Sequence, residues 1–246
     1  MIEAVRVAVA GVGNNTSALV QGIAYYRQSG ALVGLSRPVI DGVGVGDVEF
    51  VAAFATSPGK IGKDLTEAIF LAPNNFPRLD CELPPAGVPV TEGLRDGDGI
   101  DRVAAKLAGA DVLLYSAPSG RPATALAYAE AARRAGVAFV NTTSDAVARD
   151  PECLARFTAA GVPLLGDDLA SQFGTSVLHD ALLRLLAERG LSLVSSYQVL
   201  WAAPQPPPPG GPVSAAMSPR PPRCSSRRRA RRSEARGGRE WARLRR

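Results

Sequence analysis

The sequence predicts an α/β fold built on a doubly wound parallel sheet, and three observations lead to it. Short apolar runs alternate with segments of helical spacing along residues 1–197. A turn containing Gly11 and Gly13 follows the first apolar run and precedes a helix start. Pro122 and Gly136 bound a helical segment in the positions that these residues favour. Right-handed crossovers bring the carboxyl ends of parallel strands to one edge, so the loops after the first five strands should converge on one ligand.

The expected elements alternate along the chain. Strands are predicted near 5–10, 48–54, 111–115, 137–141, 162–165 and 191–198. Helices are predicted between them, near 16–28, 60–70, 100–109, 122–135, 150–160 and 171–189. Asp150-Pro151 is a typical helix start, while Gly161 and Gly190 are typical helix ends.

The composition divides the chain into two parts. With 246 residues and 46% apolar content, the chain can form one large or two modest domains with a core. Residues 198–246 hold twelve arginines against two glutamates, a net charge of +10, which leaves −5 for the rest of a chain whose total is +5. Nine of the twenty prolines also lie there, including Pro206 to Pro209. We therefore predict an ordered domain at 1–198 and a disordered tail at 199–246.

Cysteine usage and hydropathy indicate the compartment. Cys81, Cys153 and Cys224 are far apart and odd in number, which fits reduced thiols rather than a disulfide framework. They show no metal-ligand spacing, so no metal site is expected. The sequence starts a strand within five residues without a leader pattern, and no run reaches the roughly 18 apolar residues of a membrane span. We expect a cytoplasmic protein without a membrane partner.

The turn after the first strand has the features of a phosphate-binding turn. Gly11 and Gly13 permit a sharp turn and close approach of the backbone, and residues 14–17 are good N-cap types. The helix amides that follow would face an anion in the turn. Thr16 stands where the usual fingerprint has a third glycine, and two asparagines follow Gly13. The alternative is that the glycines only make a turn.

The loop after the second strand lacks a familiar cofactor contact. NAD enzymes usually carry an acidic residue there, which binds the adenosine ribose, but this chain has Ala55 and Thr56. Ser57, Lys60 and Lys63 follow. They either accept a cofactor phosphate or decorate a helix start, and we favour the second interpretation.

Two further loops carry open alternatives. The small residues of Tyr115–Thr124 either line a nucleotide pocket or form an ordinary strand-to-helix turn. After the fifth strand, Asp167 and Asp168 either cap the following helix or bind a ligand in a cofactor cleft.

Taken together, these segments resemble the myo-inositol-phosphate synthase family, in particular its shorter prokaryotic branch. The resemblance covers about residues 1–198, with the motifs in order and at family-like spacing. The segments that carry it are VAGVGNNTSALVQG at 9–22, VEFVAAF at 48–54, GVAFVN at 136–141, GVPLLGDD at 161–168 and SYQ at 196–198.

That resemblance implies a Rossmann domain that binds NAD and an isomerase activity. Family members convert glucose 6-phosphate to 1D-myo-inositol 3-phosphate by oxidation, aldol cyclisation and reduction, a step of inositol and phospholipid biosynthesis. NAD is a catalytic cofactor in this reaction, so it is not consumed. A second domain supplies most substrate contacts, several catalytic lysines and the tetramer interface. In this chain that second domain is missing or replaced by the tail.

The family's cofactor site is carried over residue by residue. The resemblance assigns the pyrophosphate turn to Gly11, Gly13, Asn14, Asn15, Thr16 and Ser17, a nucleotide-lining loop to Ser116, Pro118, Ser119 and Gly120, and a nicotinamide-side contact to Asp168. The chain also departs from the family, with Ala55 in place of an aspartate and Ala170 in place of a lysine.

The sequence assigns no catalytic residue. An aldol cyclisation needs positive charge at the developing oxyanions, yet the only lysines are Lys60, Lys63 and Lys106, upstream of the last cleft loop. Arg121 and Arg184 are candidate surrogates, although an arginine on a helix is more often solvated. The single histidine, His179, is expected to pack rather than to act in catalysis.

The tail leaves alternatives open. Its mixture of Pro, Arg, Ala and Gly after Gln198 is typical of GC-rich coding sequence read out of frame, so a frameshift is one interpretation and a genuine tail is the other. A genuine tail would bind polyanions through the arginines at 227–232, which would make the chain an inactive NAD-binding module that associates with nucleic acid. A third alternative is a divergent paralog that cyclises another sugar phosphate.

Overall fold

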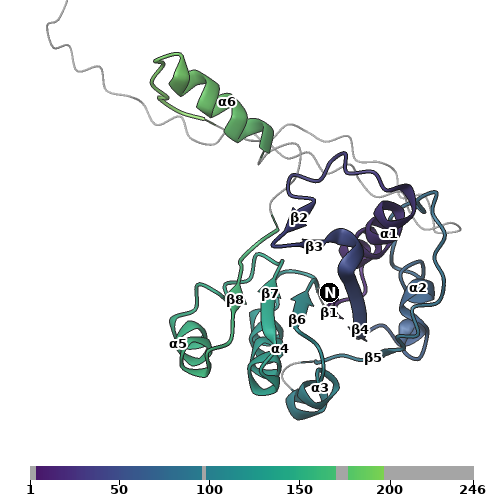
Figure 1. Ribbon diagram of the computed structural model, residues 1–246. Helices are drawn as coiled ribbons and strands as arrows, with labels where there is room; N and C mark the ends of the chain where they lie inside the picture. The colour runs from purple at the N-terminus through teal and green to yellow at the C-terminus, as the bar shows by residue number, and fades with distance from the viewer. Residues whose placement is uncertain (1–3, 96–97, 170–176, 197–246) are drawn as a thin grey trace, which may run out of the picture. The chain divides into compact units, whose positions relative to one another are not determined.

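The computed structural model describes residues 4–95, 98–169 and 177–196, shown as ribbons in Figure 1. All of them belong to one compact unit, Met1–Ser196. The second unit, Tyr197–Arg246, lies outside the described residues, and the predicted tail at 199–246 lies there with it.

A six-stranded parallel sheet forms the centre of this unit. Its strands are β1 (Val5–Ala10), β4 (Val48–Ala55), β5 (Val90–Glu92), β6 (Val112–Tyr115), β7 (Ala138–Asn141) and β8 (Leu164–Leu165). They lie in the order β5-β4-β1-β6-β7-β8. Counted along the chain this is the doubly wound order 3-2-1-4-5-6, whose direction reverses between β1 and β6. The predicted fold class is confirmed.

Helices alternate with the strands of this sheet along the chain. The α-helices are α1 (Asn14–Ser29), α2 (Leu65–Ala68), α3 (Ile100–Lys106), α4 (Pro122–Ala135), α5 (Pro151–Ala160) and α6 (Val177–Glu188), and the 3-10 helices are η1 (Val45–Asp47) and η2 (Pro58–Lys60). Helices α1, α4 and α5 each end at a glycine in the left-handed conformation. Asp150 caps α5 by accepting the Cys153 amide at 2.7 Å.

Two apolar cores cover the two faces of the sheet. Ala8 and Ala10 of β1 belong to the core that includes α3, α4 and α5, whereas Val7 and Val9 belong to the core that includes α1 and α2. Figure 1 shows α3, α4 and α5 together and α1 and α2 apart from them. Since successive strand residues point to opposite faces, a strand buried on both faces must be continuously apolar, and β1 is.

The structure corrects the prediction at several elements. The helix predicted at 60–70 is instead the 3-10 helix η2 followed by the single turn of α2, because Gly62 between them has a φ of +82°. The three-residue strand β5 was not predicted, nor was the small antiparallel pair β2 (Val39–Ile40) and β3 (Val43–Gly44). These segments are too short for a periodic pattern to indicate them.

The strand predicted at 191–198 is wrong over its described part, because residues 191–196 form no strand. Leu193 and Val194 are exposed to 54% and 97%, so an alternating apolar pattern exists without a neighbouring strand to pair with. The rest of that prediction, 197–198, lies outside the described residues.

Helix α6 contributes nothing to the two cores. None of its residues is buried, and Leu178, Leu182 and Leu185 are about half exposed. His179 was expected to pack; it is half-buried, and its Nε2 lies 2.6 Å from Ser196 Oγ. No helix in the described part of the chain is both long enough and apolar enough to cross a membrane.

Candidate functional site

A cavity of 410 Å³ opens at the carboxyl ends of β1, β4 and β6, where the strand order reverses. Open parallel sheets bind their ligands at this point. The glycine turn, the end of β4 and the loop after β6 line it: Gly11, Val12, Gly13, Asn14, Asn15, Phe54, Ala55, Thr56, Ser57, Lys60, Pro73, Asn74, Leu94, Tyr115, Ser116, Ala117, Pro118, Ser119, Arg121, Thr124 and Tyr128. The cavity therefore unites three of the loops that the sequence predicts to converge.

Gly11 brings the turn against the loop that follows β6. Its φ is +98°, and a Cβ there would lie 2.6 Å from the Ala117 amide nitrogen and 2.7 Å from the Ser116 carbonyl. Its own amide donates to the Phe54 carbonyl at 2.9 Å. Only glycine fits this place, for reasons of packing within the protein rather than of ligand contact.

Gly13 differs, because a Cβ added there would meet no protein atom within 4 Å. It is the N-cap of α1, and no side chain caps that helix. The first amides of an α-helix have no carbonyl partner inside the helix, and the helix dipole makes that end positive. An uncapped helix start beside open space fits the phosphate of a dinucleotide.

The Asn14 side chain holds a neighbouring segment in place. Its Oδ1 accepts the amides of Asn75 at 2.9 Å and Phe76 at 3.1 Å, and its Nδ2 donates to Asn75 Oδ1 at 2.6 Å. Asn15 is exposed and also lines the cavity. Of the two asparagines, Asn15 keeps its side chain available to a ligand.

Thr16 and Ser17 are buried beneath the turn. Thr16 Oγ1 donates to the Gly11 carbonyl at 2.6 Å, and Ser17 Oγ accepts from Gln21 Nε2 at 3.1 Å. Neither residue lines the cavity. Both side chains therefore support the shape of the turn. The sequence pattern could not distinguish this structural role from contact with a ligand.

A residue in the loop after β7 holds the loop after β6 in place. Ser116, Pro118 and Ser119 line the cavity, whereas Gly120 does not. The Gly120 amide donates to Asp145 Oδ1 at 3.0 Å, and Asp145 is buried. Sequence reasoning missed Asp145, since a lone aspartate in a loop carries no signal of burial.

Asp145 also accepts the Arg121 amide, at 3.2 Å, and is thus bonded to two successive residues of the loop. The Arg121 residue itself lines the cavity. The other surrogate, Arg184, is 76% exposed and pairs with Asp180 on α6 at 2.8 Å. Ala170, where the family has a lysine, lies outside the described residues.

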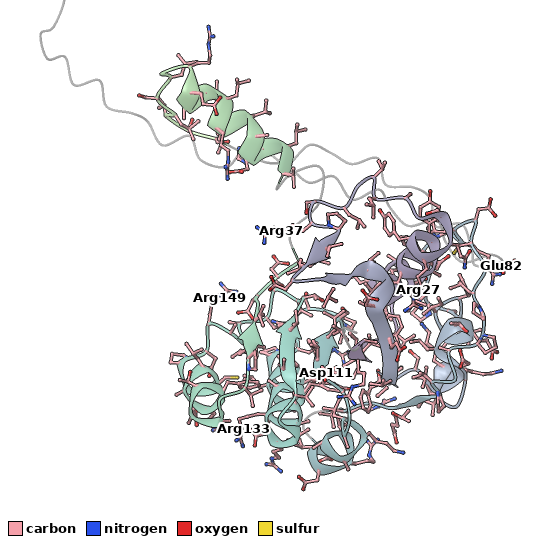
Figure 2. All side chains as sticks on the ribbon, in the orientation of Figure 1. Arg27, Arg37, Glu82, Asp111, Arg133 and Arg149 are labelled. Carbon is pink, nitrogen blue, oxygen red and sulfur yellow. The ribbon has the colours of Figure 1, made fainter. Side chains whose placement is uncertain are left out.

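The two adjacent aspartates have different surroundings. The Asp167 side chain is fully buried and accepts the amides of Val147 and Ala148, each at 3.0 Å, and the Nε of Arg149 at 3.2 Å. Burial acts to raise the pKa of Asp167, but the hydrogen bonds from Ala148, Asn141 and Val147 outweigh it, so its pKa is lowered. Figure 2 labels Arg149 beside β8. Asp167 is a structural residue that neither alternative anticipated.

Asp168 is exposed, with a φ of +77°. Its amide donates to the Thr143 carbonyl at 2.8 Å, and it does not line the cavity. A nicotinamide-side contact from Asp168 therefore stays a prediction.

Two buried polar groups, those of Lys60 and Tyr115, lie in the cavity wall. Lys60 is 2% exposed, although we expected it on a helix surface. The Tyr115 hydroxyl is buried without a hydrogen-bond partner among the described residues, and burial raises its pKa, so it is a neutral donor. An unsatisfied buried hydroxyl in a cavity wall suits a ligand that has a polar group there.

Curated sequences and solved structures show which proteins this chain is similar to. The chain is 38% identical over 214 residues to the inositol-3-phosphate synthases of Mycolicibacterium smegmatis and Corynebacterium glutamicum, which covers 79% of this chain. This chain is a relative of the inositol-3-phosphate synthases. It spans 59% of the length of these two synthases. No protein-family model matches the chain.

Solved structures agree with the fold. The crystal structure of Ari2 is 51% identical in sequence, with a TM-score of 0.72, and the match covers 78% of this chain and 62% of Ari2. A myo-inositol-1-phosphate synthase-related protein from Thermotoga maritima matches with a TM-score of 0.58 at 21% identity, over 76% of this chain and 60% of that one. The second likeness shows the fold alone.

Proposed function

We propose that the described residues form the NAD-binding half of an isomerase related to the inositol-3-phosphate synthases. The observation that carries the proposal is the cavity at the reversal of the strand order, where an uncapped helix start faces open space at Gly13. The relatives at 38% identity support the reaction class. Cofactor, substrate and tetrameric assembly are parts of this proposal.

In this function, the start of α1 and the loop after β6 contact different parts of the cofactor. The amides at the start of α1 would hold the pyrophosphate, and the loop at Ser116–Ser119 would cover the nucleotide from β6. When bound, NAD supplies a hydride acceptor that later returns the hydride to the sugar. The protein must keep the cofactor in one orientation through both transfers, and the bonds of Asp145 to the Gly120 and Arg121 amides restrain that loop.

Stabilisation of the oxyanions during ring closure needs fixed positive charge near the sugar. Arg121 lines the cavity and is the described arginine best placed for it. The chain spans 59% of the synthases it matches, so we infer that the remaining charge comes from the region that the relatives have in addition. The proposal therefore assigns cofactor binding to the described residues and the later steps to the region that the relatives have in addition.

Isothermal titration calorimetry of the purified chain with NAD, together with thermal melts at increasing NAD concentration, tests the proposal. We expect saturable binding with one site per chain and a rise in Tm, since a ligand that binds the folded state stabilises it. Absence of binding at millimolar NAD would overturn the proposal. Ser119→Asp places a negative charge in the loop that lines the cavity, so it should weaken NAD binding. Asp168→Asn tests the separate prediction of a nicotinamide-side contact, which expects weaker NAD binding in that variant.

A second candidate is a synthase-like enzyme for another sugar phosphate. The observation that favours it is Ala55, which stands at the end of β4 where the family resemblance implies an aspartate. Incubation of the protein with NAD and a panel of hexose phosphates separates the candidates. Inositol phosphate formed from glucose 6-phosphate supports the first, and turnover of a different hexose phosphate alone supports the second.

A further inference from the structure

The most unusual charged group of the cavity is Lys60, the last residue of η2. Its side chain turns inward, where Nζ donates to the Val12 carbonyl at 2.6 Å and to Asn74 Oδ1 at 2.7 Å. Lys63, three residues later, pairs instead with Glu67 at 2.7 Å and has a 49% exposed side chain. Two lysines in one short segment thus have opposite environments.

Lys60 has no acidic partner within ion-pair distance among the described residues. Both of its hydrogen-bond partners are neutral carbonyl oxygens, and burial lowers the pKa of its ammonium. Burying an ammonium without a counter-charge costs free energy. A lysine ammonium has three N–H donors, so one remains in addition to those that bond Val12 and Asn74. Among the described residues, the fold therefore provides no counter-charge for the ammonium that it places in the cavity wall.

The same lysine secures the glycine turn. Val12 lies between Gly11 and Gly13, and its carbonyl accepts from Lys60 and also from Asn74 Nδ2 at 3.3 Å. Asn74 is itself tied to the Ile69 carbonyl at 2.8 Å. By holding this carbonyl, the two side chains fix the orientation of the peptide planes in the turn, on which the direction of its amides depends.

We propose that Lys60 is a positioning residue of the dinucleotide site that holds the glycine turn through the Val12 carbonyl and supplies the counter-charge for the diphosphate of the bound cofactor. This inference rests on the proposed function and deepens it. A cation beneath the turn and amides at the start of α1 would act on one anion from two sides. Arginine cannot replace it well, because its planar fork needs more room than an ammonium.

The test compares four chains: wild type, Lys60→Met, Lys60→Gln and the matched control Lys63→Met. Each is titrated with NAD, with ADP, and with adenosine, which has no phosphate, by calorimetry or saturation-transfer NMR. We expect Lys60→Met to weaken NAD and ADP binding by about tenfold or more, and to leave adenosine binding within about twofold. Lys60→Gln keeps a donor without the charge and should lose most of the same affinity. Lys63→Met should bind like wild type.

The outcomes separate this inference from the proposed function. Wild type that binds NAD while Lys60→Met binds it equally well overturns the role of Lys60 alone. An equal loss for adenosine and NAD shows a merely structural lysine and also overturns it. Wild type that binds ADP but not NAD, with the loss in Lys60→Met, retains Lys60 and overturns the cofactor proposal. Wild type that binds neither overturns both. Thermal melts of every variant confirm that the titrated chains are folded.

Discussion

The Asp145 carboxylate accepts the Gly120 amide at 3.0 Å, although the two residues belong to loops that follow different strands. This bond and the one from the Arg121 amide at 3.2 Å couple the loop after β7 to the loop that lines the cavity after β6. We predict that Asp145→Ala lowers the free energy of unfolding by about 2 kcal/mol, because two amides lose a buried charged acceptor. It should also weaken NAD binding.

Urea unfolding and NAD titration of Asp145→Ala provide the measurement. Asp101→Ala is the control, since Asp101 is 87% exposed and its ion pair with Arg134 is of the surface kind, worth at most about 1 kcal/mol. An Asp145→Ala chain as stable as the control would contradict the assigned tether.

The two glycines of the turn should respond differently to alanine. Gly11→Ala places a Cβ 2.6 Å from the Ala117 amide nitrogen at a φ of +98°, so we expect a loss of about 2 kcal/mol or more in stability. Gly13→Ala meets no protein atom within 4 Å, so its cost is that of a poorer N-cap, about 1 kcal/mol at most. Its methyl group enters the open space instead, and NAD affinity should fall about tenfold. Melting curves and calorimetry on the pair distinguish the effects, and the reverse order would refute the assignment.

Stability should depend on pH through Glu130. Hydrogen bonds from Arg133 lower the pKa of Glu130 from 4.5 to about 2, helped by Arg134 and opposed by burial. Figure 2 labels Arg133 on this part of α4. A carboxyl group with a lowered folded-state pKa stabilises the protein above its unfolded pKa, and this contribution is lost as the pH falls from about 4.5 towards 2.

The check is Glu130→Gln, compared with wild type in urea at a series of pH values. At pH 7 the variant should be less stable by an amount on the order of 2 kcal/mol, and the difference should shrink as the pH falls below about 4.5. A difference that stays constant with pH would show that packing, and not the charge, is responsible.

Ala55 offers a gain-of-affinity test. It is 7% exposed at the end of β4 and lines the cavity, where an aspartate would bind the adenosine ribose. Ala55→Asp should strengthen NAD binding by about tenfold through a charged hydrogen bond and weaken NADP binding through repulsion of the 2′-phosphate. Parallel titrations with NAD and NADP measure the ratio. An unchanged ratio would mean that the adenosine ribose does not lie at the end of β4.

The sequence by itself determined the fold class, most strands of the sheet and the glycine turn that lines the cavity. Continuous apolar runs predicted β1, β4, β6 and β7, because a parallel strand between two helical layers is apolar on both faces. The GVG turn after β1 predicted the loop that lines the cavity. Both signals are local, so they can be read without knowing what lies beside them.

Only the tertiary structure decided what individual side chains do. Lys60 and Asp145 are ordinary charged residues in sequence, and their roles arise from Val12 and Gly120, which lie 48 and 25 positions away along the chain. Strand pairing likewise decided that residues 191–196, though patterned for a strand, form none. Strand and turn signals depend on neighbours along the chain, so the sequence alone reveals them. Burial and hydrogen bonding depend on neighbours distant in sequence, so only the tertiary structure reveals them.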